Sequence, residues 1–91
     1  MSIPPTSVVA RVPGVLATDV AGQLVLLSEE LRYLGLDRTG QVVWELLEKP
    51  QTLDDLVDEL VRRFDVSQQQ CRSEVSEFLV DLEKRHVVTI E

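Results

Sequence analysis

The period of the apolar residues changes once along the chain, near Asp37. Before that point, short β-prone runs separated by turn residues predict strands at residues 15–19, 24–27 and 31–36. The links between them are too short for a parallel crossover, so these strands are expected to form an antiparallel meander. A further extended piece at residues 8–12 precedes them. If the last strand of the meander lies at an edge, its backbone N–H and C=O groups have no partner within the domain.

After Asp37, apolar residues recur at the spacing of an amphipathic helix. Asp37 or Thr39 can cap a first helix that runs to about Glu48, and Pro50 prevents this helix from continuing. Its apolar face comprises Val43, Trp44, Leu46 and Leu47.

Two further helices are predicted, each opened by a capping-box pattern. Thr52 with Asp55 begins the second helix, and Ser67 with Gln70 begins the third, which runs to about Arg85. The apolar stripes are Leu53, Leu56, Val57, Leu60, Val61 and Phe64 on the second helix, and Cys71, Val75, Phe78, Leu79 and Leu82 on the third. A β-prone tail at residues 87–90 can pair back onto the sheet.

The length of 91 residues allows one domain and no second core. Residues 1–7, which include Pro4 and Pro5, are expected to form a flexible arm, and residues 8–91 a single domain. The sequence therefore predicts an α+β fold resembling a winged helix-turn-helix, with a three-stranded antiparallel sheet packed on three helices.

The charge of the chain narrows the class of partner. Sixteen acidic against nine basic residues give a net charge of −7, which repels phosphate backbones and anionic membrane surfaces. No apolar run is long enough to span a membrane, and the first residues do not resemble a signal peptide. We expect a cytoplasmic monomer that binds neither nucleic acid nor a membrane.

The residues available for chemistry argue against an enzyme. The single cysteine, Cys71, excludes an internal disulfide and a zinc site built from several thiolates. The single histidine, His86, follows it by 15 residues, which is ~22 Å along a straight helix and too far for a catalytic pair. Phosphate-binding and metalloprotease motifs are absent from the sequence. No catalytic residue, metal site or cofactor is predicted, and we interpret the chain as a binding module.

The predicted fold order suits two kinds of binding. A nucleic-acid-binding winged helix would insert its third helix into a groove, but this helix carries three basic residues against four acidic ones. The alternative is peptide capture, in which an extended peptide pairs with the edge strand at residues 31–36 beside the third helix. On that helix Arg72, Ser76, Leu79 and Glu83 are expected on the flank next to the core stripe, as the wall of a groove. Tyr33 and Leu34 alternatively complete the core, where Phe78 and Leu82 are expected.

An ordered set of segments resembles one known family. The matching segments are Leu24 to Ser28 (LVLLS), Arg32 to Gly40 (RYLGLDRTG), Val43 to Leu47 (VWELL), Thr52 to Leu60, Phe64 to Val66, and Val75 to Leu82. Together they resemble the PqqD-like family, the recognition elements of pathways that modify ribosomally made peptides (RiPPs). The resemblance extends from Val15 to Val88. The free-standing chain, with Ser28-Glu29-Glu30 after the second strand, is most similar to the stand-alone recognition proteins of lasso-peptide biosynthesis.

The resemblance implies a function without catalysis. Such proteins bind the leader of a precursor peptide as an added strand against the third strand, in a groove that the third helix closes. A lasso-type leader carries a Tyr-x-x-Pro-x-Leu segment whose three side chains enter this groove. Delivery to a separate cysteine-protease-like leader peptidase would follow, and an ATP-dependent cyclase would close the ring. The residues that correspond to the peptide-binding positions are Leu31, Arg32, Tyr33, Leu34, Arg72, Val75, Ser76 and Leu79. A peptide chaperone for another modification pathway and a nucleic-acid-binding winged helix remain the alternatives.

Overall fold

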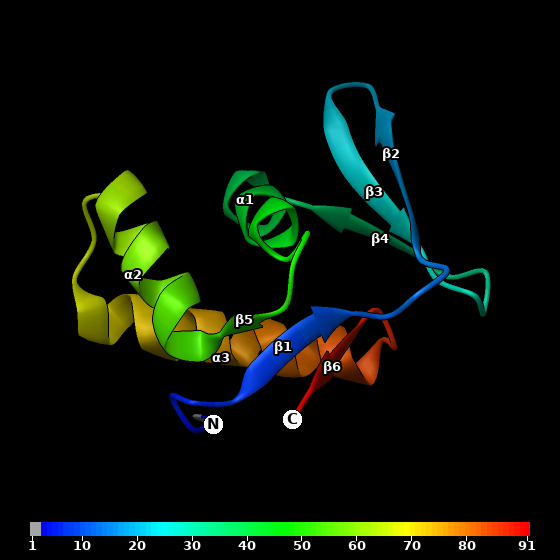
Figure 1. Ribbon diagram of the computed structural model, residues 1–91. Coiled ribbons are helices and arrows are strands. Elements are labelled where there is room, and N and C mark those ends of the chain that lie inside the picture. Colours follow the sequence, from blue (N-terminus) through cyan, green and yellow to red (C-terminus); the bar gives the residue numbers. More distant parts are fainter. Residues whose placement is uncertain (1–2) are drawn as a thin grey trace.

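The computed structural model describes residues 3–91. Its elements in chain order are β1 (Val8–Arg11), β2 (Leu16–Val20), β3 (Gln23–Leu27), β4 (Tyr33–Leu36), α1 (Arg38–Leu46), β5 (Gln51–Thr52), α2 (Leu53–Arg63), α3 (Gln68–Lys84) and β6 (Val88–Ile90). The three helices gather on one side of the molecule, and the β2–β3 hairpin projects away from them (Figure 1).

The predicted meander is confirmed as an antiparallel sheet in the order β2-β3-β4. β3 is the central strand: its Leu26 is opposite Ala17 of β2 on one side and Leu34 of β4 on the other. The last strand of the meander is therefore an edge strand, which is the case considered above from the sequence. It is shorter than predicted, because it begins at Tyr33 instead of Leu31.

The extended N-terminal piece and the C-terminal tail form a second sheet, in the order β5-β1-β6. The tail was expected to pair back onto the meander, but β6 pairs with β1 instead. The reason is a tight turn at the end of α3, where His86 adopts a left-handed backbone conformation with φ 62°. This turn directs the chain back over α3, so that Val87 and Val88 are buried against it.

The expected N-terminal arm lies against the start of α2 over the part that the structure describes. The backbone N–H of Leu53 donates to the Ser7 carbonyl, and the N–H of Asp54 donates to the Pro5 carbonyl. Residues 1 and 2 of the arm lie outside the described residues.

Each helix begins at a side-chain cap that the sequence indicated. Asp37 Oδ1 accepts from the Gly40 N–H at 2.7 Å, which decides between the two candidate caps of α1. Thr52 Oγ1 accepts from Asp55 N–H and Ser67 Oγ from Gln70 N–H, each at 3.1 Å. These bonds satisfy N–H groups that the helix itself leaves without a partner. The start of each helix is thus fixed by local sequence.

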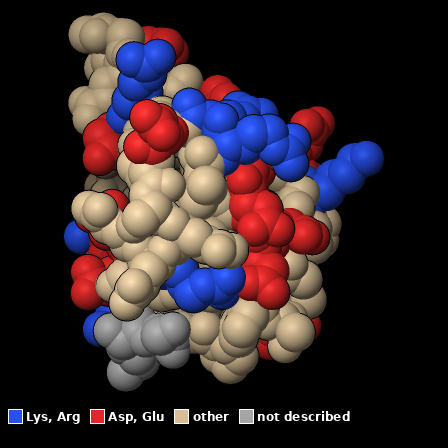
Figure 2. Space-filling model, turned by 90° about the vertical axis from the view of Figure 1, so that its left-hand side faces the viewer, with Lys and Arg blue, Asp and Glu red and all other residues tan. Residues whose placement is uncertain are grey.

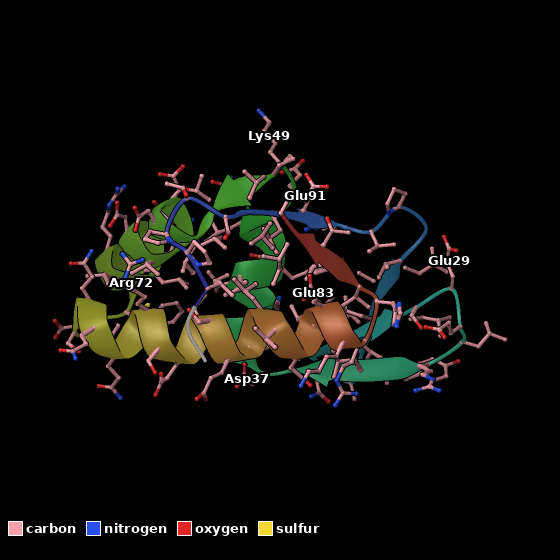
Figure 3. The ribbon with its side chains drawn as sticks, turned by 90° about the horizontal axis from the view of Figure 1, so that it is seen from below. Glu29, Asp37, Lys49, Arg72, Glu83 and Glu91 are labelled. Atoms are coloured by element: carbon pink, nitrogen blue, oxygen red, sulfur yellow. The ribbon has the colours of Figure 1, made fainter. Side chains whose placement is uncertain are left out.

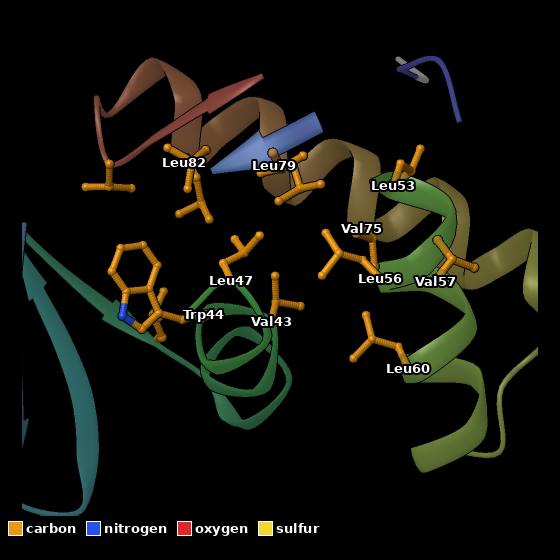
Figure 4. Close-up of a cluster of buried hydrophobic side chains, with 14 of the residues drawn as sticks. Val43, Trp44, Leu47, Leu53, Leu56, Val57, Leu60, Val75, Leu79 and Leu82 are labelled. Carbon is orange, nitrogen blue, oxygen red and sulfur yellow. The ribbon is translucent and has the colours of Figure 1, made fainter. Parts of the chain in front are cut away.

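The core is built almost entirely from Leu and Val side chains that the three helices and both sheets contribute. Side chains of α1, α2 and α3 converge in its centre (Figure 4). Trp44 is buried at one side, with the Arg11 guanidinium 4.4 Å from the centre of its ring. The buried apolar residues are Val9, Leu26, Leu36, Val43, Trp44, Leu47, Leu53, Leu56, Val57, Leu60, Cys71, Val75, Leu79, Leu82, Val87 and Val88.

Truncation of the core stripe of α2 is expected to destabilise the protein. Leu60→Ala removes a fully buried side chain and should lower the free energy of unfolding by about 2–5 kcal/mol. Urea denaturation followed by circular dichroism measures this change. Asp58→Ala, at an exposed position of the same helix, is the matched control and should change it by less than about 0.5 kcal/mol. Equal effects of the two substitutions would contradict this description of the core.

Candidate functional site

The free edge of β4 presents backbone groups to the surroundings. The Ser28 N–H donates to the Arg32 carbonyl at 3.0 Å, so the hydrogen-bonding groups of Arg32 face β3. Because these groups alternate along an antiparallel strand, those of Leu34 and Leu36 also face β3. The N–H and C=O groups of Tyr33 and Gly35 consequently face the open edge.

This open edge is short because the chain turns at both of its ends. Before β4, Leu31 has a left-handed backbone with φ 61° and donates its N–H to the Ser28 carbonyl at 2.9 Å. After β4, Asp37 caps α1 directly. Tyr33 and Gly35 are therefore the residues at which a further strand can pair.

The side chains of β4 alternate between the two faces of the sheet. Leu36 is buried and Leu34 packs partly against the core, whereas Tyr33 is 73% exposed on the outer face. Leu31, outside the strand, is 76% exposed. The alternative that Tyr33 completes the core is thus excluded, while Leu34 does contribute to it.

The helix side of the predicted site differs from the expectation. Ser76 and Leu79 are fully buried and Val75 nearly so, hence the prediction that Ser76 and Leu79 lie on an open flank is wrong. The reason is that α3 packs against α2 along one side and against β6 along another. The apolar pattern of a single helix does not show whether a second element also packs against the neighbouring face of that helix.

Arg72 also lies away from the strand. It pairs with Asp54 of α2, and Figure 3 shows it at the N-terminal end of α3, whereas β4 passes beside the opposite half of the helix. Glu83, which is exposed, lies in that C-terminal half (Figure 3). The structure therefore brings together the predicted strand residues but separates them from Arg72.

Other residues of α3 are those that border β4. A Cβ atom added at Gly40 would lie 3.1 Å from Phe78 Cζ and 3.5 Å from Leu36 Cβ, so Phe78 lies beside the end of the strand. Near the start of the strand, Lys84 and Arg85 share a cavity with Leu34. Phe78 was assigned to the core from its place on the apolar stripe, but it is only partly buried. The helical spacing of residues 74, 78, 81 and 85 is the signal that could have identified this face.

A cavity opens at each end of β4. The larger, of about 310 Å³, adjoins the Asp37 end and is mainly apolar. It is lined by Asp37, Thr39, Gly40, Val43, Leu60, Phe64, Val66, Cys71, Glu74, Val75 and Phe78. The smaller, of about 170 Å³, adjoins the Tyr33 end, and its lining includes Arg32, Lys84, Arg85 and His86. We call the edge of β4 together with the cavity at each of its ends the β4 groove, and treat it as the candidate site.

The charges on the surface do not form a continuous basic face on the α2 side of the molecule. On that side basic and acidic side chains are intermixed around a broad uncharged area (Figure 2). Such a distribution offers no track for a phosphate backbone.

Cys71 and His86 lie at opposite ends of α3. Cys71 lines the larger cavity, where burial foremost and the Glu74 carboxylate second raise the pKa of its thiol, against an opposing effect of Arg72. His86 follows the far end of α3.

Within residues 3–91, no group of His, Cys, Asp and Glu side chains is arranged to hold a metal ion. None of the helices in the described part of the chain is both long and apolar enough to cross a membrane.

Comparison with known proteins now identifies the family. The family model described as coenzyme PQQ synthesis protein D, PqqD, matches residues 23–88. The chain belongs to the PqqD family. The resemblance seen in the sequence is therefore confirmed, and the matched span includes β3, β4 and all three helices. A comparison with curated proteins gives no match.

Two solved structures share this fold. One is TbiB1 in complex with the TbiA(beta) leader peptide, with a TM-score of 0.79 and 24% identity, covering 87% of this chain and 93% of that chain. The other is the solution structure of the PqqD part of Methylobacterium extorquens PqqCD, described as a functional stand-alone RiPP recognition element. It has a TM-score of 0.76 and 21% identity, covering 90% of this chain and 88% of the other. The predicted α+β class with an antiparallel sheet and three helices is confirmed.

The environment of Cys71 predicts low thiol reactivity. Because the raised pKa leaves little thiolate near neutral pH and the side chain is buried, a disulfide reagent should modify the native protein slowly at pH 8. In urea the same thiol should react at the rate of a free cysteine. Release of the chromophore from Ellman's reagent measures both rates, and an equally fast reaction of native and unfolded protein would contradict the burial of Cys71.

Proposed function

We propose that this member of the PqqD family binds the leader segment of a ribosomally made precursor peptide, of the lasso-peptide type, and presents it to modifying enzymes. The observation that carries the proposal is the open edge of β4, with the N–H and C=O groups of Tyr33 and Gly35 directed outward. TbiB1, whose solved complex contains a leader peptide, has the same fold. The protein acts by binding and not by catalysis.

The proposed mechanism is addition of a strand to the sheet. A leader segment pairs antiparallel to β4, because the rest of this sheet is antiparallel and such pairs are slightly more stable than parallel ones. Each backbone hydrogen bond to Tyr33 or Gly35 contributes about 0.5–1.5 kcal/mol. With this direction, the N-terminal end of the segment lies near Asp37 and its C-terminal end near Arg32.

Side-chain anchors supply the selectivity. The larger cavity beside Phe78 is apolar and open to one end of the added strand, so it suits a large apolar or aromatic side chain of the leader. Leu34 and Phe78 border the groove, whereas Val75 contributes only to the floor of the larger cavity. Arg72, Ser76 and Leu79 have no place in this arrangement, and Leu31 and Arg32 flank the start of the strand.

The proposal includes delivery of the bound precursor to separate modifying enzymes. A leader held at one strand leaves the rest of the precursor free for a separate cysteine-protease-like leader peptidase and an ATP-dependent cyclase. Neither partner is needed for the initial binding step. The protein would therefore bind the leader as a monomer in the cytoplasm.

A proline at Tyr33 tests the strand-addition mechanism. Proline removes the outward N–H, so Tyr33→Pro should abolish binding of a labelled synthetic leader that carries a Tyr-x-x-Pro-x-Leu segment. Fluorescence anisotropy reports binding, and circular dichroism reports that the helices remain folded. Leu34→Pro is not equivalent, because the N–H of Leu34 faces β3.

Tyr33→Ala is the matched control for this substitution. It removes the same exposed ring but keeps the N–H, so its affinity should fall only by the loss of side-chain contact. A folded Tyr33→Pro protein that binds the leader as well as Tyr33→Ala does would show that β4 is not the docking edge.

Salt distinguishes peptide binding from binding to nucleic acid. Affinity for the leader should change little between about 50 mM and about 200 mM salt, whereas a protein that contacts many phosphates loses about 10³–10⁵ over that range. Titration with the labelled leader and with labelled duplex DNA at both concentrations measures this. Salt-sensitive binding of DNA together with no binding of the leader would favour the winged-helix alternative.

A further inference from the structure

Basic side chains concentrate around the smaller cavity, in a chain that is acidic overall. Arg32 from the β4 side and Lys84, Arg85 and His86 from the end of α3 line it, with Glu30 as the acidic side chain in the same lining. The chain has nine Lys and Arg residues and one His in all, and a net charge of −7. This clustering runs against the charge of the molecule as a whole.

Two of the basic side chains at this cavity have no acidic partner among the described residues, although they lie close to one another. At the end of α2, both Arg62 and Arg63 pair with Glu59. At the smaller cavity only Arg85 has such a partner, Asp81 at 3.0 Å, while Arg32 and Lys84 make no ion pair within residues 3–91. The partial negative charge at the C-terminal end of a helix favours basic side chains there, which explains Lys84 and Arg85 at the end of α3. It does not explain Arg32, which lies before β4 and outside this helix.

The backbone on both sides of this cavity is held in place. On the strand side, the Arg32 N–H donates to Ser28 Oγ at 3.3 Å. On the helix side, the N–H of Val87 donates to the Leu82 carbonyl across the left-handed turn at His86. Such a turn usually carries Gly or Asn, because a side chain there is strained. The structure thus fixes the backbone from which the exposed basic side chains extend on both walls.

We propose that the smaller cavity binds a carboxylate side chain of the leader, at the residues that follow the segment paired with β4. This inference rests on the proposed function, since the antiparallel direction brings the C-terminal end of the added strand to Arg32 and Lys84. A carboxylate there meets two basic groups that make no ion pair within the described part of the chain. A cationic leader residue at the same place is repelled, so the cavity selects leaders by charge as well as by apolar anchors.

A small acidic peptide tests the cavity without any leader. N-acetyl-triglutamate amide is titrated into ¹⁵N-labelled protein at low salt, with N-acetyl-triglutamine amide in parallel. Saturable shifts are expected for the amide signals of residues 28–34 and 84–87 with the glutamate peptide alone. The doubly substituted protein Arg32→Gln, Lys84→Gln should lose these shifts. The Arg62→Gln, Arg63→Gln protein, with the same change of net charge, should keep them.

The labelled leader then tests the role of the cavity in recognition. Changing the two residues after the paired segment to Gln should weaken binding about three- to tenfold relative to Glu at both positions. The Arg32→Gln, Lys84→Gln protein should bind both versions equally.

The possible failures are distinguishable. Shifts that do not saturate, that appear equally with triglutamine, or that centre on Arg62 and Arg63 overturn the carboxylate site. The same holds for leader binding that does not change between Glu and Gln. Saturable triglutamate shifts at the cavity combined with no leader binding at all would instead refute strand addition and leave the anion site in place.

Discussion

The burial of α3 along two of its sides is the constraint on which the rest of the structure depends. α2 packs on one side of this 17-residue helix, and β6 returns along another. Leu79 and Leu82 are fully buried as a result. Only one strip of the helix remains to face β4, and that strip begins at Phe78 and ends in the basic residues at the helix terminus. The position of the groove is therefore a consequence of core packing, not a separate feature.

Local patterns predicted the elements well because each depends on nearby residues. Asp37, Thr52 and Ser67 cap the helices as expected, since a cap requires only a side-chain oxygen and an N–H three residues later. The meander followed from the short links between its strands. The edge position of the last strand was left open by the sequence, because the tail at residues 87–90 could also have paired with that sheet.

Tertiary relations were predicted less well. The periodicity of α3 does not reveal how many elements pack on the helix, so Ser76 and Leu79 were placed on a groove wall that they do not reach. The pairing of β6 with β1 depends on the left-handed turn at His86. His is enriched among the few non-Gly residues with positive φ, but most His residues have negative φ, so the residue type alone does not predict the turn. Arg72 was placed near the strand from its position on the helix and from the family resemblance, whereas its ion pair with Asp54 holds it at the opposite end of α3. The basic cavity also went unnoticed, because its walls come from residues more than fifty positions apart in the sequence.

The shortness of the β4 edge has a consequence for discrimination. With only Tyr33 and Gly35 available, a complete backbone ladder contributes about 2–6 kcal/mol, which offsets at most the lower end of the cost of about 4–15 kcal/mol for immobilising a partner. Main-chain pairing is the part of the interaction that any extended polypeptide can make. A strand edge that ends in a turn on one side and a helix cap on the other therefore binds nascent or unfolded chains only weakly when they offer nothing but an extended backbone. The short edge thus limits non-specific pairing with extended chains. Tight binding requires a peptide whose side chains also fit the cavities at the two ends of β4.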